Sequence, residues 1–552
     1  MSNQVPPMSL NLGEHQTAVD ARLRSWRSEE IGRRMWDRDH TVWSRDPLPE
    51  LTNRLGWLDL ADSMQPRLPE FEALTRSAIE DGYSHIVLLG MGGSSLAPEV
   101  FAAVFDCAEG NPALTVLDST HPDAVRAVER QVDPTSTLFL VSSKSGTTLE
   151  TMSLFRRMWR RVSDVSDNPG RSFVAITDPG SSLQGLAEER GFRRVVSAPS
   201  EVGGRYSALS PFGLVPAALI GANVTRLLSR AKVMAEASSP TVPEDENPGL
   251  VLGAVLGELA LAGVDKVTLT TSPALAAFPA WIEQLVAEST GKNGMGILPV
   301  DSEPQVPIEC YGKDRLFVSI ALAGDRTANN PVDLDAIAQA GHPVVSIELA
   351  EKADLGQEMF RWEMATAAAG AILGINPFDQ PDVQLAKELA QRAMAEPDFG
   401  SEATGGGSID ITSRDSLERE LEDWVKVRAG DYIAIQAYVA PTPDSEALLQ
   451  EIRQALGSRL GVAITLGIGP RFLHSTGQLH KGGPPTGRFL QLVDEPGEDV
   501  AIPETDYGFG TLIEAQALGD YQALLQRDRR VLRVNLGSDT AGGLRRLLEI
   551  TS

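Results

Sequence analysis

Short apolar runs recur along the chain and alternate with stretches that have the pattern of helices. Runs of about four to seven residues rich in Val, Ile and Leu are typical of parallel strands that helices cover on both faces. Their alternation with helices predicts right-handed βαβ units and an α/β fold with a doubly wound parallel sheet. In the first half of the chain these runs lie at residues 85–90, 113–119, 137–143, 173–177 and 194–198.

A second set of runs follows a long apolar helical region at 211–237 and predicts a second sheet of the same kind. This repetition divides the chain into a first α/β domain at 61–240 and a second at 241–552. The runs of the second set lie at residues 266–271, 315–322, 343–349, 432–439 and 462–468.

Two segments depart from the alternation. Residues 1–60 have a charged, tryptophan-bearing helical sequence without a recognisable strand, which predicts a helical N-terminal arm. Residues 399–415 contain the consecutive glycines Gly405, Gly406 and Gly407 and predict a flexible insertion. The insertion is interpreted either as a lid or as a plain surface loop.

Composition narrows the class of protein. The 552 residues are 42% hydrophobic and 22% charged, which fits a large globular protein with more than one core. The formal net charge of -26 repels polyanions, so nucleic acid is not an expected partner. Cys107 and Cys310 lie far apart, and the sequence shows neither an export signal nor an apolar stretch of about 18 residues. We therefore expect a cytoplasmic protein without a disulfide framework, a thiolate metal site or a membrane span.

Ligand-binding chemistry is expected just after the strands, because ligands of open α/β sheets bind beyond the carboxyl ends of the strands. The run at 85–90 leads into Gly92, Gly93 and Ser94. A dinucleotide fingerprint would need a third glycine, where Ser95 stands. The turn indicates close approach of backbone N–H groups to an anion, or simply a tight turn.

The second candidate segment follows the run at 137–143 and opens a helix. Its five hydroxyl side chains and one glycine exceed what a helix cap needs, since one hydroxyl suffices for a cap. The helix N-terminus adds partial positive charge, so the segment predicts a cradle for a phosphate group, the alternative being a cap with surplus hydroxyls. The predicted cradle residues are Ser143, Lys144, Ser145, Thr147, Thr148 and Thr151.

Several motifs in the sequence resemble those of the glucose-6-phosphate isomerase family. They are GMGGS at 90–94, SKSGTTLET at 143–151, GGRYS at 203–207 and AESTGKNG at 287–294, with INPFDQPDVQLAK at 375–387 and LHSTGQLHKGG at 473–483 extending the match. The resemblance implies two sugar-isomerase (SIS) domains and a phosphate loop at the predicted cradle, with Ser94 added from the glycine turn. It also implies a reaction that uses neither cofactor nor metal ion.

The implied reaction interconverts glucose 6-phosphate and fructose 6-phosphate through ring opening and a cis-enediol intermediate. The resemblance assigns proton transfer between C1 and C2 to Glu288, with Gln284 one helical turn before it, and one carboxylate suits both halves of that transfer. Arg205 would stabilise the enediolate oxygens with a permanent positive charge. The alternative for Arg205 is a structural salt bridge.

The resemblance assigns ring opening to His474 and Lys387. It also implies that Gln478 binds the substrate. An imidazole titrates near neutral pH and can accept or donate the proton, although His480 is a competing choice. Family members place the histidine motif before the lysine motif, whereas here Lys387 precedes His474. This order resembles the isomerase half of fused transaldolase–isomerase proteins. The chain has no room for a complete extra barrel, so we expect no transaldolase activity.

Partners and alternative functions follow from the same resemblance. The family's histidine reaches the site from the partner subunit, so a homodimer is expected. A noncatalytic phosphosugar-binding regulator usually carries a basic DNA-binding unit, and none is recognisable. An amidotransferring isomerase would need an N-terminal glutaminase with a cysteine nucleophile. A metal-dependent isomerase would need a dense cluster of His and carboxylate residues, which the sequence lacks.

Overall fold

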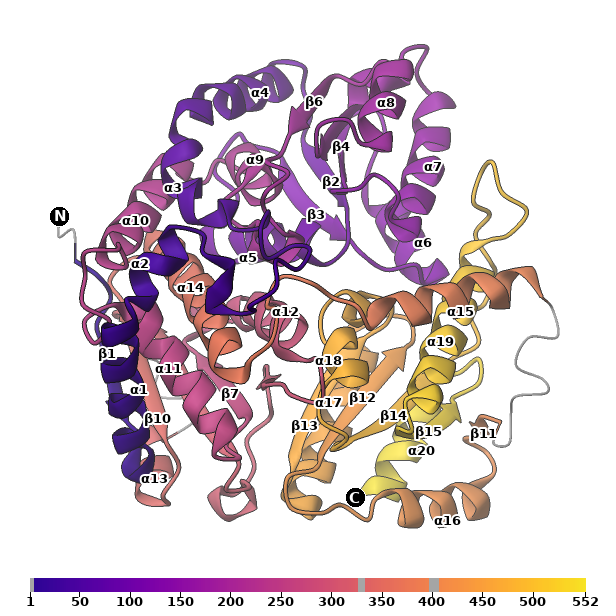
Figure 1. Ribbon diagram of the computed structural model, residues 1–552. Coiled ribbons are helices and arrows are strands. Elements are labelled where there is room, and N and C mark those ends of the chain that lie inside the picture. The colour runs from indigo at the N-terminus through magenta and orange to yellow at the C-terminus, as the bar shows by residue number, and fades with distance from the viewer. Residues whose placement is uncertain (1–3, 326–332, 397–406) are drawn as a thin grey trace.

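Within the residues that the structure describes, the chain forms three five-stranded sheets, each flanked by helices (Figure 1). The computed structural model describes residues 4–325, 333–396 and 407–552. The prediction of an α/β fold with parallel sheets is confirmed. The sequence pattern indicated two sheets, whereas the structure divides the strands of residues 241–552 between two sheets. The domain boundaries at 60 and 240 stay predictions.

The first unit is a fully parallel sheet with the strand order β3-β2-β4-β5-β6. The order changes direction between β2 and β4, so the loops after these two strands meet at a topological switch point. Its strands are β2 His85–Leu89, β3 Ala113–Leu117, β4 Thr137–Ser142, β5 Phe173–Thr177 and β6 Arg194–Ser197. Its helices are α4 Leu68–Glu80, α5 Leu96–Phe105, α6 Pro122–Gln131, α7 Leu149–Ser163, α8 Ser182–Glu189 and α9 Pro211–Leu219.

The second unit has the strand order β1-β10-β9-β7-β8, and only β1 runs antiparallel to its neighbour. Strand β1 belongs to the N-terminal arm, where the sequence showed helices alone. It is a four-residue edge strand, too short for a clear apolar run. The strands are β1 Met8–Asn11, β7 Lys266–Thr271, β8 Leu298–Val300, β9 Arg315–Leu322 and β10 Val344–Leu349. The helices are α1 Gln16–Glu29, α2 Ile31–Trp36, α3 Leu60–Ser63, α10 Val224–Ala237, α11 Pro248–Leu261, α12 Phe278–Thr290, α13 Leu334–Gln339 and α14 Leu355–Leu373.

The third unit is a parallel sheet with the order β11-β15-β14-β12-β13. The apolar pattern does not predict β14, because the buried Arg488 and Gln491 interrupt its apolar run. Arg488 pairs with Asp431 at 3.0 Å. The strands are β11 Ile409–Asp410, β12 Tyr432–Tyr438, β13 Ala463–Ile468, β14 Gly487–Val493 and β15 Arg530–Asn535. The helices are α15 Val383–Ala395, α16 Arg414–Trp424, α17 Pro443–Leu460, α18 Gly477–Gly482, α19 Phe509–Gln526 and α20 Thr540–Thr551.

Two expected segments differ from their predicted form. The helical region 211–237 is split into α9 and α10 around Gly221, whose φ is 83° and whose missing Cβ would lie 2.5 Å from the Ala108 side chain. Only glycine fits such a backbone and such a contact. Residues 399–406 of the predicted insertion at 399–415 lie outside the described residues. Its remainder, 407–415, contains β11 and the start of α16.

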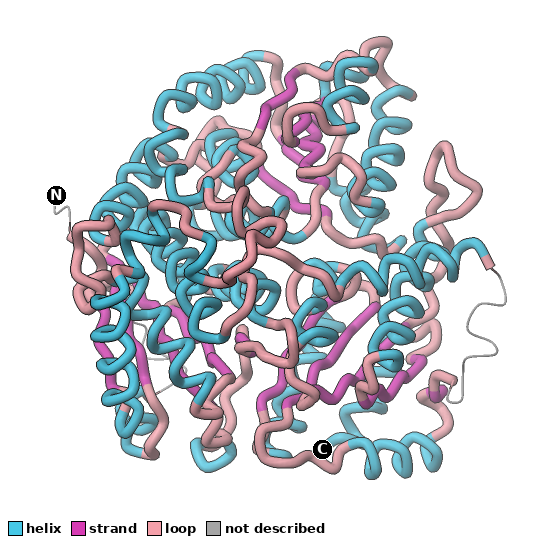
Figure 2. Tube along the Cα trace, in the orientation of Figure 1, coloured by secondary structure: helices cyan, strands magenta, loops and turns pink. Residues whose placement is uncertain are grey.

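The three units meet around α12, which lies near the centre of the molecule (Figures 1 and 2). Helix α12 packs against α5 of the first unit, α14 of the second and α18 of the third. Helix α15 packs along α19 and also contacts α18. Side chains of α12 can therefore face groups that come from all three units.

Candidate active site

The glycine turn after β2 and the loop after β4 lie side by side at the switch point. Ser142 at the end of β4 donates its hydroxyl to the Ser94 carbonyl oxygen at 3.2 Å. A Cβ on Gly93 would lie 2.1 Å from the Gly204 carbonyl oxygen, so this position needs glycine to pack against the turn that carries Arg205. A Cβ on Gly92 would similarly lie 2.7 Å from the Gln284 amide nitrogen. The turn is therefore a close junction between backbone segments.

The predicted cradle forms a tight loop that ends at the N-terminus of α7. The Ser143 hydroxyl accepts the Gly146 N–H at 3.1 Å and lies 3.0 Å from the Thr148 hydroxyl, while Gly146 has a φ of 73°. The Ser145 hydroxyl accepts the Thr147 N–H at 3.2 Å. Thr148 is the N-cap residue but makes no side-chain cap bond. The first N–H groups of α7 therefore receive no cap from the Thr148 side chain.

Two other cradle residues have contrasting surroundings. Thr151 is fully buried on the first turn of α7, and its hydroxyl has no hydrogen-bond partner within the described part of the chain. Lys144 instead pairs with Asp178 at 2.5 Å and donates to the Ser200 carbonyl oxygen at 3.2 Å. Burial lowers the pKa of Lys144. The lysine is thus engaged inside the first unit.

Glu288 lies on α12 and faces the guanidinium of Arg205. Its carboxylate is 3.3 Å from Arg205 Nη1, and the side chains are 14% and 3% exposed, respectively. Gln284 donates its amide to Glu288 at 3.1 Å. Gln284 and Glu288 are one helical turn apart, which puts both on the same face of α12. The sequence-predicted base, cation and amide are therefore brought together.

Arg205 is held in place by protein groups on every side. Its Nε donates to the Ser289 hydroxyl at 2.7 Å, and Nη2 donates to the carbonyl oxygens of Pro377 and Asp379 at 2.8 and 2.9 Å. Gln380 accepts from Nη1 at 2.9 Å. Pro377, Asp379 and Gln380 all belong to the NPFDQ segment. This segment therefore fixes the position of the Arg205 guanidinium.

Lys292 binds the same segment, although sequence reasoning gave it no role within AESTGKNG. Its ammonium donates to the carbonyl oxygen of Asn376 at 2.7 Å and to the Asp379 carboxylate at 2.8 Å. Burial, reinforced by the charge of Arg205, lowers the pKa of Lys292 to about 8. Two cationic side chains therefore fix the NPFDQ segment beside Glu288.

His474 reaches this site from the third unit of the same chain. Its Nε2 lies 3.0 Å from Glu150 Oε1, and its carbonyl oxygen accepts from the Gln284 amide at 2.7 Å. Burial raises the pKa of Glu150, but the charge and hydrogen bond of His474, together with a backbone hydrogen bond and the charge of Lys387, outweigh burial and hold the pKa below its ordinary value. Glu150 also accepts from Gln516 at 2.7 Å. Glu150 stood inside the SKSGTTLET motif, yet sequence reasoning did not single it out.

The competing histidine has different surroundings. His480 is buried beside Tyr432, Phe472 and Phe489, and its Nδ1 lies 3.2 Å from the Gln436 amide. Burial holds the pKa of His480 well below its ordinary value. His480 is thus packed among aromatic rings of the third unit.

Gln478 and Lys387 complete the set of predicted residues. Gln478 is fully buried and donates to the Gly291 carbonyl oxygen at 2.9 Å and to Asp382 at 2.8 Å. The Gln478 amide therefore links the segments that contain Gly291 and Asp382 by hydrogen bonds. Lys387 is exposed on α15, and its positive charge lowers the pKa of Glu150. Despite the swapped motif order, His474 contacts the Glu150 carboxylate, and the charge of Lys387 contributes to the lowering of its pKa.

Comparisons with known proteins agree with these motifs. Residues 69–297 match the family model described as phosphoglucose isomerase. The glucose-6-phosphate isomerase of Rubrobacter xylanophilus is 29% identical over 58% of this chain and 84% of its own length. A glucose-6-phosphate isomerase of Thermus thermophilus is 30% identical over 62% of this chain and 90% of its own length. The chain belongs to the glucose-6-phosphate isomerase family.

Solved structures of isomerase family members and related folds share the architecture. A hypothetical protein from Thermus thermophilus aligns over 70% of this chain and its whole length, with 25% identity and a TM-score of 0.60. A glucose-6-phosphate isomerase from Chlamydia trachomatis covers 74% of this chain and 91% of its own, with 21% identity and a TM-score of 0.56. The second likeness supports the fold alone. The resemblance to the isomerase family that the motifs suggested is thus confirmed.

Proposed function

We propose that this site interconverts glucose 6-phosphate and fructose 6-phosphate by ring opening followed by proton transfer through a cis-enediol. The family and its named relatives support an aldose–ketose isomerase. The observation that carries the proposal is the pairing of Glu288 with Arg205 at 3.3 Å. Gln284 links this pair to the His474 turn, and His474 contacts Glu150 on the first turn of α7. A base and a fixed cation near a helix N-terminus support isomerisation of a phosphorylated sugar.

The phosphate group is assigned to the loop 143–148 and the N-terminus of α7. Backbone N–H groups and hydroxyls there supply short-range donors, which outweigh the negative net charge of the whole protein at contact distance. Ser94 and the buried hydroxyl of Thr151 add donors from either side. Lys144 is bound to Asp178 and reaches the phosphate only if that pair opens.

Ring opening is assigned to His474 with Glu150 as its support. If Nε2–H donates to the ionised Glu150, the other ring nitrogen is left to accept the proton of the O1 hydroxyl. Lys387, whose charge is felt at Glu150, would then donate toward the ring oxygen. The sugar leaves this step as an open chain with a carbonyl group.

Proton transfer is assigned to Glu288 with Arg205 as its electrostatic partner. The carboxylate removes the C2 proton of the aldose and returns it to C1, so one group serves both halves of the reaction. The guanidinium of Arg205 is oriented in advance by Ser289 and the NPFDQ carbonyl oxygens, and it stabilises the enediolate as charge develops. The free Oε1 of Gln284, buried and without a partner among the described residues, can accept a sugar hydroxyl.

The test supplies fructose 6-phosphate to the purified protein with EDTA present and follows glucose 6-phosphate with a coupled dehydrogenase. We expect turnover that EDTA does not change. Binding of the sugar phosphate without turnover would instead favour the noncatalytic regulator. A requirement for added metal would favour metal-dependent isomerisation, although no group of three His, Cys, Asp or Glu side chains suited to a metal occurs within the described ranges.

Oligomeric state and location belong to the proposal. The site draws His474 and Glu288 from one chain, so a homodimer, which stays a prediction, is not needed to supply the histidine. A cytoplasmic location is supported by the two unpaired cysteines, Cys107 and Cys310. In the part of the chain that the structure describes, every helix is too short or too polar to cross a membrane.

A further inference from the structure

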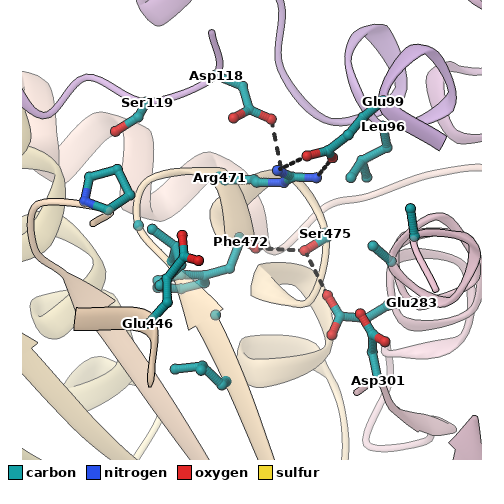
Figure 3. A pocket seen from close by; sticks show the side chains of 17 residues that line it. Leu96, Glu99, Asp118, Ser119, Glu283, Asp301, Glu446, Arg471, Phe472 and Ser475 are labelled. Carbon is teal, nitrogen blue, oxygen red and sulfur yellow. Dashed lines mark hydrogen bonds and ion pairs between the residues drawn. The ribbon is translucent and has the colours of Figure 1, made fainter. Parts of the chain in front are cut away.

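The turn that carries His474 has two sides. The turn, η11 Arg471–His474, presents His474 toward Glu150 and Gln284 on one side. On the other side, Arg471, Phe472 and Ser475 line a cavity of about 330 Å³ between the three units (Figure 3). The far side of this turn has no part in the chemistry proposed above, yet it carries a dense set of charges.

Arg471 lies between two carboxylates of the first unit (Figure 3). Its Nη1 is 3.1 Å from Glu99, its Nη2 pairs with the same carboxylate, and its Nε is 3.3 Å from Asp118. Asp118 also accepts the Ser95 hydroxyl at 3.1 Å. A two-pronged contact of this kind fixes the direction of a guanidinium as well as its position.

The two carboxylates come from rigid parts of the first unit. Glu99 lies on α5, which begins just after the glycine turn at 92–94, and Asp118 directly follows β3. Glu150, the partner of His474, lies on α7 of the same unit. Arg471 therefore ties the histidine turn to the unit that also holds the phosphate loop.

The remaining contacts of the turn do not fix it to the first unit. The Ser475 hydroxyl donates to Glu283 at 3.4 Å and the His474 carbonyl oxygen accepts from Gln284, and both partners lie on α12. Phe472 packs against Tyr438 of the third unit. Among the residues described, the polar side-chain contacts of this turn with the first unit are therefore those of Arg471 and the His474–Glu150 contact itself.

We propose that Arg471 is a positioning residue, whose ion pairs with Glu99 and Asp118 hold the 471–475 turn so that the His474 imidazole meets Glu150. This inference rests on the proposed ring-opening role of His474. Because His474 and Glu150 belong to different units, their 3.0 Å contact depends on how those units are fixed to each other. A displacement of about 1 Å in a reacting group can lower a rate about a hundredfold.

The experiment compares Arg471→Gln and Arg471→Lys with the parent enzyme in two assays. The coupled assay measures isomerisation, and magnetisation-transfer NMR measures exchange between the α and β anomers of glucose 6-phosphate, which requires ring opening alone. We expect Arg471→Gln to slow both rates about tenfold with KM little changed, and Arg471→Lys to recover part of the loss. Anomer exchange within twofold of the parent in a folded Arg471→Gln protein would overturn the proposal.

Two further variants serve as a second test and as a control. Glu99→Gln removes one partner and should give the same pattern more weakly, which serves if Arg471→Gln does not fold. Arg190→Gln breaks a 2.8 Å ion pair with Glu504 without touching the histidine turn, and anomer exchange should then stay at the parent rate. An equal loss in Arg190→Gln would show a general docking effect and overturn the specific role. Glu288→Gln, which should keep anomer exchange and lose isomerisation, tests the proposed function separately.

Discussion

The first and third units contribute to one site in different ways. In the first unit, the loop 143–148 is formed by contacts within a few residues of one another, such as Ser143 with Gly146. In the third unit, His474 obtains its setting from Glu150 and Gln284, which are distant in the sequence. The loop is built by local contacts and can be predicted from the sequence. The surroundings of His474 depend on long-range contacts and become evident only in the folded chain.

The largest effect is expected for the base on α12, where the units meet. Glu288→Gln should lower kcat about 10³-fold while KM for fructose 6-phosphate changes little, because phosphate binding does not involve this carboxylate. Steady-state kinetics checks this. Glu283→Gln is the matched control, since Glu283 lies on the same helix but lines the cavity behind the histidine turn, and its kcat should stay within about threefold of the parent. An equal loss in both variants would contradict the assignment.

The next largest effect is expected for the pair formed by His474 and Glu150. His474→Ala should lower anomer exchange about 10²-fold, and Glu150→Gln about tenfold, because the amide no longer stabilises the protonated ring. Magnetisation-transfer NMR measures both. His480→Ala offers the comparison for a histidine packed among aromatic rings, and any loss there should follow its thermal stability. If His480→Ala abolished ring opening in a stable protein, the roles of the two histidines would be reversed.

Mixing experiments test whether the site is completed within one chain. Inactive Glu288→Gln and His474→Ala proteins, unfolded together and refolded as a mixture, should regain no activity, because both residues act in the same chain. The coupled assay measures recovery. A return of about a quarter or more of parental activity would mean that a partner subunit supplies the histidine.

A smaller, structural effect is expected in the glycine turn. Gly93→Ala puts a Cβ at 2.1 Å from the Gly204 carbonyl oxygen and should destabilise the first unit by about 2 kcal/mol. Thermal unfolding checks the loss. Gly185→Ala, on α8 where a new Cβ meets nothing within 4 Å, should be neutral or slightly stabilising. Equal stability of the two variants would show that the close turn relaxes freely.

The smallest effect concerns the cavity behind the histidine turn. Burial and the neighbouring Asp301 raise the pKa of Glu283 to about 8, so the folded protein holds a proton that the unfolded chain loses near pH 4.5. Stability should therefore fall as pH rises from about 4.5 to 8. Glu283→Gln should flatten this fall and raise the unfolding temperature at pH 8.5 by a few degrees. The exposed Glu446→Gln should leave the slope unchanged, and a slope unaltered by Glu283→Gln would refute the linkage.

Much of the first unit could be predicted because its signals are local. Five apolar runs became five parallel strands, and the hydroxyl-rich segment became the loop before α7. The third unit was harder, since Arg488 and Gln491 sit inside a buried strand where their polar groups find partners such as Asp431. Glu150 and Arg471 could not be assigned for the same reason: their importance lies in contacts with residues hundreds of positions away.

Lys387 and His474 show that the order of two motifs in the sequence need not decide where their side chains lie in the fold. The lysine arrives on α15 and the histidine on η11, by independent paths through the fold; the histidine contacts Glu150, and the charge of the lysine contributes to the low pKa of that carboxylate. Two segments whose sequence order is reversed can therefore still bring their side chains toward the same carboxylate. Homology among these isomerases is better judged by superposed side chains than by the succession of motifs in an alignment.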